Sequence, residues 1–138
     1  MADLISRWTR LLLACAVAAG VVALAGCSSS QPAYCSDRAN LQNSVKGLTS
    51  LNVSSGVSGL KSQVEKIQSD ATAVVSSAKS DFPSETSAIT TSIDALKSSV
   101  TALSSSPSAG QVATVTKDAA NVVSSVKSFI DASNSKCS

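Results

Sequence analysis

VSGLKSQVEKIQSDATAVVSSA, residues 57–78, repeats apolar side chains at intervals of three and four. These positions are Val57, Leu60, Val64, Ile67, Ala71, Val74 and Ala78. Because an α-helix turns once about every 3.6 residues, this spacing gathers all of them on one face. The stretch therefore predicts a long helix with one apolar face, which other helices must cover.

Three other stretches carry the same spacing. Their apolar positions are Leu41, Val45, Leu48 and Leu51 in the first, Ile89, Ile93, Leu96, Val100 and Leu103 in the second, and Val112, Val115, Ala119, Val122, Val126 and Phe129 in the third. Valine and threonine favour β-strands. However, alternate positions from Val112 to Asp118 read Val, Thr, Thr and Asp, which gives no apolar strand face. The period therefore favours four helices.

Turn-forming residues separate these stretches at 52–56, 81–84 and 104–107. Ser108, with Gln111 three residues later, fits a capping box at the start of the last helix. Connections this short favour antiparallel neighbours. We expect an all-α fold, a small antiparallel bundle of four helices that run up, down, up, down, with the first helix the shortest. A bundle of three long helices with a short, frayed first helix is the alternative.

Composition and charge exclude several classes of function. The chain has 138 residues, enough for one domain, a net charge of +2 and no histidine. It carries no basic stripe and few aromatic side chains for base stacking, so we expect no nucleic-acid partner. Without histidine it lacks the commonest general base and the commonest metal ligand. We expect neither a metal nor a cofactor.

The first 27 residues differ in composition from the rest of the chain. Residues 1–10 carry Arg7 and Arg10 against one acidic side chain, and residues 11–24 are apolar throughout. A charged start followed by an apolar run of this length is typical of a secretory signal peptide. The run is shorter than the roughly 20 residues that a membrane-spanning helix needs.

The tetrapeptide Leu24-Ala25-Gly26-Cys27 ends this region and resembles the lipobox of bacterial lipoproteins. The resemblance implies that a diacylglyceryl group is attached to the thiol of Cys27, and that the signal peptidase recognises Leu24, Ala25 and Gly26 and cuts before Cys27. Two acyl chains would hold the protein stably on a membrane. The family places such proteins on the extracytoplasmic face of the cell membrane.

The chain therefore divides into a lipoprotein signal peptide (1–26), a lipidated cysteine with a flexible tether (27–34) and a helical bundle domain (35–138). Fully extended, the tether reaches at most about 26 Å. Cys35 precedes the first helix and Cys137 follows the last, so the expected topology brings both to the same end of the bundle. In an oxidising compartment this pair predicts a disulfide. Two free thiols or an intermolecular bond are the alternatives, and a metal site is less favoured.

The two ends of the expected bundle differ. Tyr34, Phe82 and Phe129 should cluster beside the disulfide, either as a plug that closes this end or as a contact with the lipid interface. At the opposite end the first helix stops early. A groove for a ligand or partner is expected there unless a loop covers it, lined by Leu51, Val53, Val57, Leu103 and Val112.

One pattern suggests catalysis. The spacing S-x-x-K, known from penicillin-binding proteins, occurs at Ser58/Lys61, Ser76/Lys79, Ser124/Lys127 and Ser133/Lys136. Its companion motifs are absent and serine is abundant, so we interpret these lysines as a solvated face. We expect a non-enzymatic lipoprotein of the cell envelope that is structural or binds a protein or envelope component. A carrier that holds a small ligand or lipid in an interhelical crevice is the alternative, and a Ser/Lys hydrolase is a third hypothesis.

Overall fold

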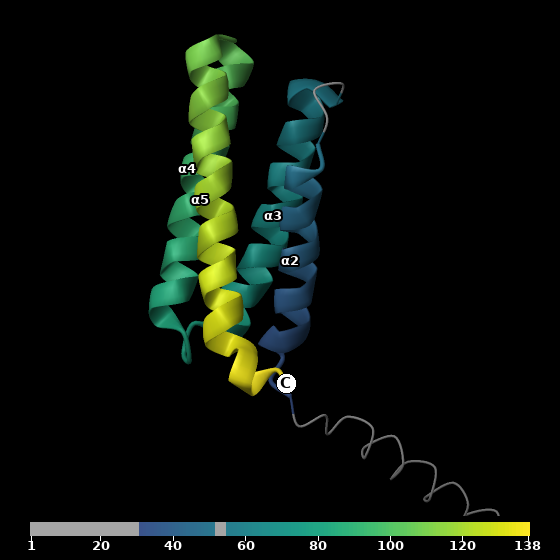
Figure 1. Cartoon of the computed structure of the whole chain (residues 1–138), viewed down its shortest axis with the longest axis vertical. Coiled ribbons are helices and arrows are strands. Elements are labelled where there is room, and N and C mark those ends of the chain that lie inside the picture. Colours follow the sequence, from purple (N-terminus) through teal and green to yellow (C-terminus); the bar gives the residue numbers. More distant parts are fainter. Residues whose placement is uncertain (1–30, 52–54) are drawn as a thin grey trace, which may run out of the picture. The chain divides into compact units, whose positions relative to one another are not determined.

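Four α-helices follow one another along residues 31–51 and 55–138, the part of the chain that the computed structural model describes. They are α2 (Tyr34–Thr49), α3 (Gly56–Ala78), α4 (Pro83–Ser105) and α5 (Ala109–Ser133), and the 3₁₀ turn η2 (Asn134–Lys136) follows them. Successive helices run in opposite directions (Figure 1). The predicted all-α bundle is confirmed, and α2, at 16 residues, is the shortest of the four helices.

Local sequence explains where three of the helices begin. Gly56 opens α3 with a φ of 61°, a left-handed conformation that side chains with a Cβ rarely adopt. Pro83 lies in the first turn of α4, where its missing N–H costs no helical hydrogen bond. The Ser108 side chain accepts a hydrogen bond from the backbone N–H of Gln111 at 3.2 Å. The predicted N-cap of α5 is therefore confirmed.

Sequential neighbours pack most closely. The α4–α5 interface is the most extensive, α2–α3 and α3–α4 follow, and α2–α5 is the smallest of the four interfaces between adjacent helices. The bundle thus consists of two helical hairpins, α2–α3 and α4–α5, joined along α3 and α4 (Figure 1). We call the boundary between α2 and α5 the seam. The end that holds Cys35 and Cys137 is the disulfide end, and the end that holds the α4–α5 connection is the far end.

The core follows the predicted helical faces. Its buried apolar side chains are Tyr34, Leu41, Val45, Leu48, Val64, Ile67, Ala71, Val74, Ala78, Ile89, Ile93, Leu96, Val100, Leu103, Val115, Val122, Val126 and Phe129. Five expected core positions stay partly or largely exposed, namely Leu51, Val57, Leu60, Val112 and Ala119. All but Ala119 belong to the far end, because α2 is about 10 Å shorter than its neighbours and stops before it covers them.

Hydroxyl side chains share the interior with the aliphatic ones. Thr86, Ser92 and Ser99 in α4 and Ser133 in α5 are buried. Each donates a hydrogen bond of 2.7–3.0 Å to a backbone carbonyl three or four residues earlier in the chain. Buried hydroxyl groups are costly only when unpaired. Serine can therefore fill helix–helix contacts here without leaving an unsatisfied polar group.

Phe129 offers a test of the core. The substitution Phe129→Ala removes a fully buried ring, so we expect the free energy of unfolding to fall by about 3–5 kcal/mol. Denaturant titration followed by far-UV circular dichroism measures the loss. Val112→Ala is the matched control, because the Val112 side chain is 52% exposed, and it should change stability by less than about 0.5 kcal/mol. Equal losses in the two variants would contradict the assigned core.

Candidate functional site

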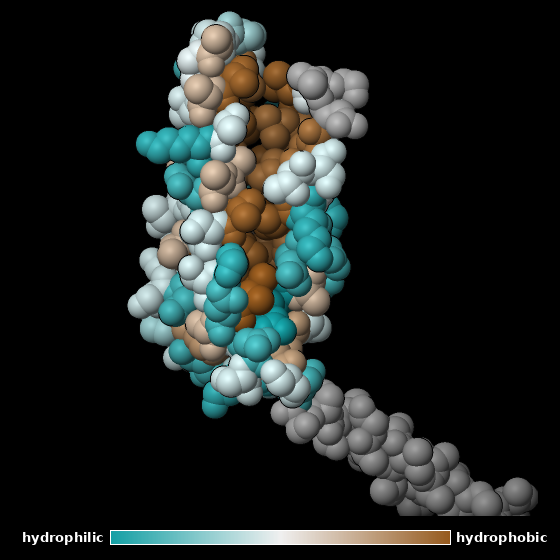
Figure 2. Space-filling model, in the orientation of Figure 1, coloured by the Kyte–Doolittle hydropathy of each residue, from teal (hydrophilic) through white to brown (hydrophobic). Residues whose placement is uncertain are grey.

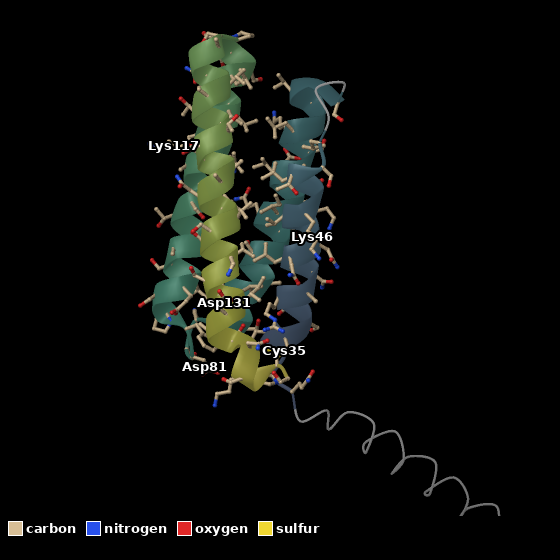
Figure 3. All side chains as sticks on the ribbon, in the orientation of Figure 1. Cys35, Lys46, Asp81, Lys117 and Asp131 are labelled. Carbon is tan, nitrogen blue, oxygen red and sulfur yellow. A yellow bond between two sulfur atoms is a disulfide. The ribbon has the colours of Figure 1, made fainter. Side chains whose placement is uncertain are left out.

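A disulfide between Cys35 and Cys137 joins the two ends of the bundle. The Cα atoms are 5.5 Å apart and the sulfur atoms 2.05 Å apart, across a separation of 102 residues. The predicted pairing is confirmed. Cys35 lies in the first turn of α2 rather than ahead of the helix, because α2 begins at Tyr34. In Figure 3 the bond lies beside the label of Cys35, at the end where the chain enters and leaves the bundle.

Three aromatic rings pack together next to the disulfide. Phe82 lies edge-on to both Tyr34 and Phe129, with ring centroids 5.5 Å apart in each pair, and the Tyr34–Phe129 centroids are 6.4 Å apart. The predicted cluster is confirmed. Tyr34 and Phe129 are buried and Phe82 is partly buried, so the rings face one another rather than solvent. This packing favours the plug over a contact with the lipid interface.

The hydroxyl group of Tyr34 is the one buried side-chain polar atom of the described residues that forms no hydrogen bond of ordinary geometry. Burial raises the pKa of Tyr34 above its ordinary value of 10.0, and the nearby Asp81 carboxylate raises this pKa further. Both effects disfavour a negative charge on the ring oxygen. Tyr34 is therefore held in its neutral form at the disulfide end.

Arg38 ties α2 to the end of α5 across the seam. Its Nη1 donates to the backbone carbonyl of Ile130 and to Oγ of Ser133, both at 3.3 Å. A cation suits this place, because the last carbonyl groups of a helix carry partial negative charge. The sequence analysis missed this contact, since no local motif relates residue 38 to a helix more than ninety residues away.

A polar cluster joins α2 to α3. Lys66 Nζ lies 3.0 Å from Ser44 Oγ and 3.2 Å from the Asp70 carboxylate, which also accepts a hydrogen bond from Ser44 Oγ. Gln63 donates to the backbone carbonyl of Ser44 at 2.6 Å, in space that a side chain at Gly47 would fill. Ser44 is only 2% exposed. A substrate could not reach this hydroxyl in the folded bundle, so the cluster fixes α2 against α3.

Seven of the eight residues in the four S-x-x-K pairs are exposed, and the eighth, Ser133, is buried. No hydrogen bond joins the serine to the lysine in any of them, and all four lie in the described part of the chain. Lys127 instead pairs with Asp131, with 2.8 Å between Nζ and Oδ2. This hydrogen bond and the carboxylate charge raise the pKa of Lys127. The arrangement provides no activated serine at these positions.

The residues of the expected far-end groove do not share one environment. Leu103 is buried, Leu51 and Val57 are partly buried against the core, and Val112 is largely exposed. Val53 lies outside the described residues. Figure 2 shows apolar side chains visible between the two hairpins, along the seam and towards the far end. The visible apolar surface therefore runs along the seam between the two hairpins and is not confined to a groove at the far end.

A shallow depression of about 200 Å³ lies on another face, between α3 and α4. Its lining mixes apolar and polar side chains: Gln68, Ala71, Thr72, Val75, Ser76, Thr90, Ile93 and Asp94. Ligand pockets are commonly about 300–1,000 Å³. Within residues 31–51 and 55–138, no cluster of His, Cys, Asp or Glu could hold a metal ion, and no helix is both long and apolar enough to span a bilayer.

The lipobox residues Leu24, Ala25, Gly26 and Cys27 lie outside the described residues, so their roles stay predictions. No protein-family model, no curated protein and no solved structure matches the chain. The sequence motifs and the geometry of the bundle are therefore the observations that bear on function.

The Tyr34 environment predicts a loss of stability at high pH. The unfolded tyrosine ionises near pH 10, whereas the folded one holds its proton to higher pH. The contribution of the buried, neutral Tyr34 side chain to the free energy of unfolding is thus complete below about pH 10 and is lost as the pH rises through the folded pKa.

We expect Tyr34→Phe to lose less stability than the wild type between about pH 8 and pH 11, measured by urea unfolding. Tyr34 is the one tyrosine in the chain, so lysine titration gives the same background in both proteins. Equal losses would contradict the assignment.

Proposed function

We propose that this protein is a lipid-anchored lipoprotein of the bacterial cell envelope, with a structural or binding role and no enzymatic one. The observation that carries the proposal is the sequence Leu24-Ala25-Gly26-Cys27 at the end of an apolar leader. The disulfide supports it, because such bonds persist in exported, oxidising compartments. The two cysteines of the folded unit are paired with each other, and of the other two, Cys15 lies inside the leader and Cys27 ends the lipobox.

The anchor would be a diacylglyceryl group on Cys27, since two chains give stable membrane attachment where one gives only marginal binding. Tyr34 begins the first helix, seven residues after Cys27. Fully extended, that segment reaches at most about 25 Å. The proposed arrangement therefore holds the bundle close to the extracytoplasmic face of the membrane.

The proposed partner is a protein or another component of the envelope. Part of the apolar surface stays uncovered at the far end, where Val112 is exposed and Leu51 and Val57 are only partly covered. Apolar residues exposed together, with polar residues around them, commonly mark interaction sites. The near balance of charges, at a net +2, does not favour a nucleic acid as the partner.

The alternative, a carrier of a small ligand or lipid, is the weaker proposal. The bundle interior is filled by side chains, and the depression between α3 and α4 holds only about 200 Å³. A carrier needs a cavity that encloses most of its ligand. This function would require the hairpins to separate.

The anchor is tested by Cys27→Ser in the producing bacterium. We expect the unsubstituted protein in the membrane fraction, with an intact mass that shows loss of residues 1–26 and gain of a diacylglyceryl group. The variant should lack the acyl mass and leave the membrane fraction. Cys15→Ser is the matched control, because Cys15 lies inside the leader, and it should behave as the wild type. A Cys27→Ser protein that remains membrane-bound at wild-type levels, without acylation, would overturn the proposal.

The non-enzymatic role predicts that no serine reacts as an activated nucleophile. Among the described residues, Ser44 is the serine whose hydroxyl bonds a lysine ammonium group; it is 2% exposed, and its hydroxyl already contacts the Asp70 carboxylate. We therefore expect a fluorophosphonate probe to label the folded protein no more than the same protein unfolded in urea. Stoichiometric labelling of one serine in the folded state, detected by peptide mass spectrometry, would favour the Ser/Lys hydrolase instead.

A further inference from the structure

The seam between α2 and α5 differs from the other interfaces of the bundle. Within the α2–α3 hairpin, polar contacts accompany the apolar ones: Ser77 donates to the Asp37 carboxylate at 2.7 Å, and Lys66 bonds Ser44. The α4–α5 hairpin has the largest interface in the bundle. Each hairpin is therefore well held together, whereas α2 and α5 share the smallest of the four interfaces between adjacent helices.

The contacts that do cross the seam gather at one end. Cys35 bonds Cys137, Arg38 donates to Ile130 and Ser133, and the Tyr34 ring lies edge-on to Phe129. On the α2 side, all three residues belong to the first five positions of the helix. The described residues show no hydrogen bond or ion pair between α2 and α5 farther along the seam. The hairpins are thus fastened to each other across the seam at the disulfide end only.

An apolar strip on α5 lies under the seam. Val123 lies seven residues, or about two helical turns, before Ile130, whose backbone carbonyl accepts the hydrogen bond from Arg38 of α2, so Val123 and Ile130 fall on the same side of α5, towards the seam. Ala119 continues the strip one turn farther. Ala119, Val123 and Ile130 are each partly buried against the core, and Figure 2 shows apolar side chains along the seam between the hairpins. Separation of α2 from α5 would expose these three side chains further.

The disulfide is within reach of a reductant. Both Cys35 and Cys137 are partly buried rather than enclosed by the core. A thiolate can therefore approach the sulfur atoms from solvent, as thiol–disulfide exchange requires.

We propose that the Cys35–Cys137 disulfide is a redox latch that keeps the seam closed. A dithiol reductant, either a small dithiol or a thiol–disulfide oxidoreductase of the envelope, supplies two electrons and two protons. The Cys35–Cys137 bond breaks into two thiols, and the reductant becomes a disulfide. The α2–α3 hairpin then swings away from α5 about the α3–α4 interface, and the apolar strip of α5 becomes fully exposed to solvent.

This latch does not depend on the acylation of Cys27, so it can fail or succeed separately from the proposed anchor. It opens the bundle without unfolding it, because the three interfaces between sequential helices remain. The helix content should therefore stay constant while apolar surface appears.

Tryptophan reporters test the latch in the full chain. Val123→Trp places a reporter under the seam, and Val75→Trp places a matched one at the α3–α4 depression, away from the seam. The chain's own tryptophan, Trp8, gives the same background in both variants. Each protein is compared in its oxidised state and after addition of dithiothreitol. An apolar fluorescent dye, anilinonaphthalene sulfonate, is added to the unsubstituted chain under both conditions.

On reduction we expect the far-UV circular dichroism to stay constant, the Val123→Trp emission to shift to longer wavelength, and dye fluorescence to rise several-fold. The Val75→Trp emission should not move. Three results would each overturn the proposal. Loss of the helical signal would mean that the disulfide holds the fold rather than the seam. An unchanged Val123→Trp emission with unchanged dye fluorescence would mean that the seam stays closed without it. Equal shifts of the two reporters would mean general loosening.

Discussion

The covalent bond between Cys35 and Cys137 is the constraint that joins the start of the first helix of this bundle to the end of the last. The three interfaces between sequential helices follow from short turns, but α2 and α5 come from opposite ends of the fold and share a smaller interface than any of the three. Closing a loop of about 100 residues is expected to contribute on the order of 4–5 kcal/mol through lost chain entropy in the unfolded state. That is a large part of the roughly 5–15 kcal/mol by which ordinary domains are stable. The disulfide, Arg38 and the aromatic cluster thus hold α2 to α5 at one end of the seam. Farther along the seam, no hydrogen bond or ion pair of the described residues joins these two helices.

The composition of the core explains why such a constraint matters. Most buried side chains are Val, Leu, Ile and Ala, and several interior positions hold serine or threonine. Small side chains bury less apolar area per residue, so each helix pair gains less from the hydrophobic effect. The buried hydroxyl groups avoid a penalty by bonding to carbonyl groups of their own helices. We therefore expect apolar burial to stabilise the α2–α5 seam least, because it is the smallest interface between adjacent helices.

Helical period, turn residues and cysteine positions were enough to predict the four helices, most of the core, the Ser108 cap, the disulfide and the aromatic cluster. The start of α2 was placed too late, because Ala33 at its N-cap offers no side-chain hydrogen bond. The sequence could not predict the contacts of Arg38, or those of Ser44 with Lys66 and Asp70. Polar contacts between helices have no periodic signal and depend on side-chain geometry. The expected groove residues divided into buried, partly buried and exposed ones because their exposure depends on where α2 ends, which the periodicity of the other helices does not specify.

Both chain ends of the described fold lie at the disulfide end, which gives the bundle a polarity that its nearly balanced charge does not reveal (Figure 1). The α4–α5 connection at residues 106–108 is the point of the fold farthest along the bundle from where the chain enters it. Epitope tags, fluorescent proteins or antibody epitopes grafted there would project away from the entry point. They would disturb neither the Cys35–Cys137 disulfide nor the seam. A tag fused after Ser138 would instead lie one residue from the disulfide that joins Cys137 to the first helix.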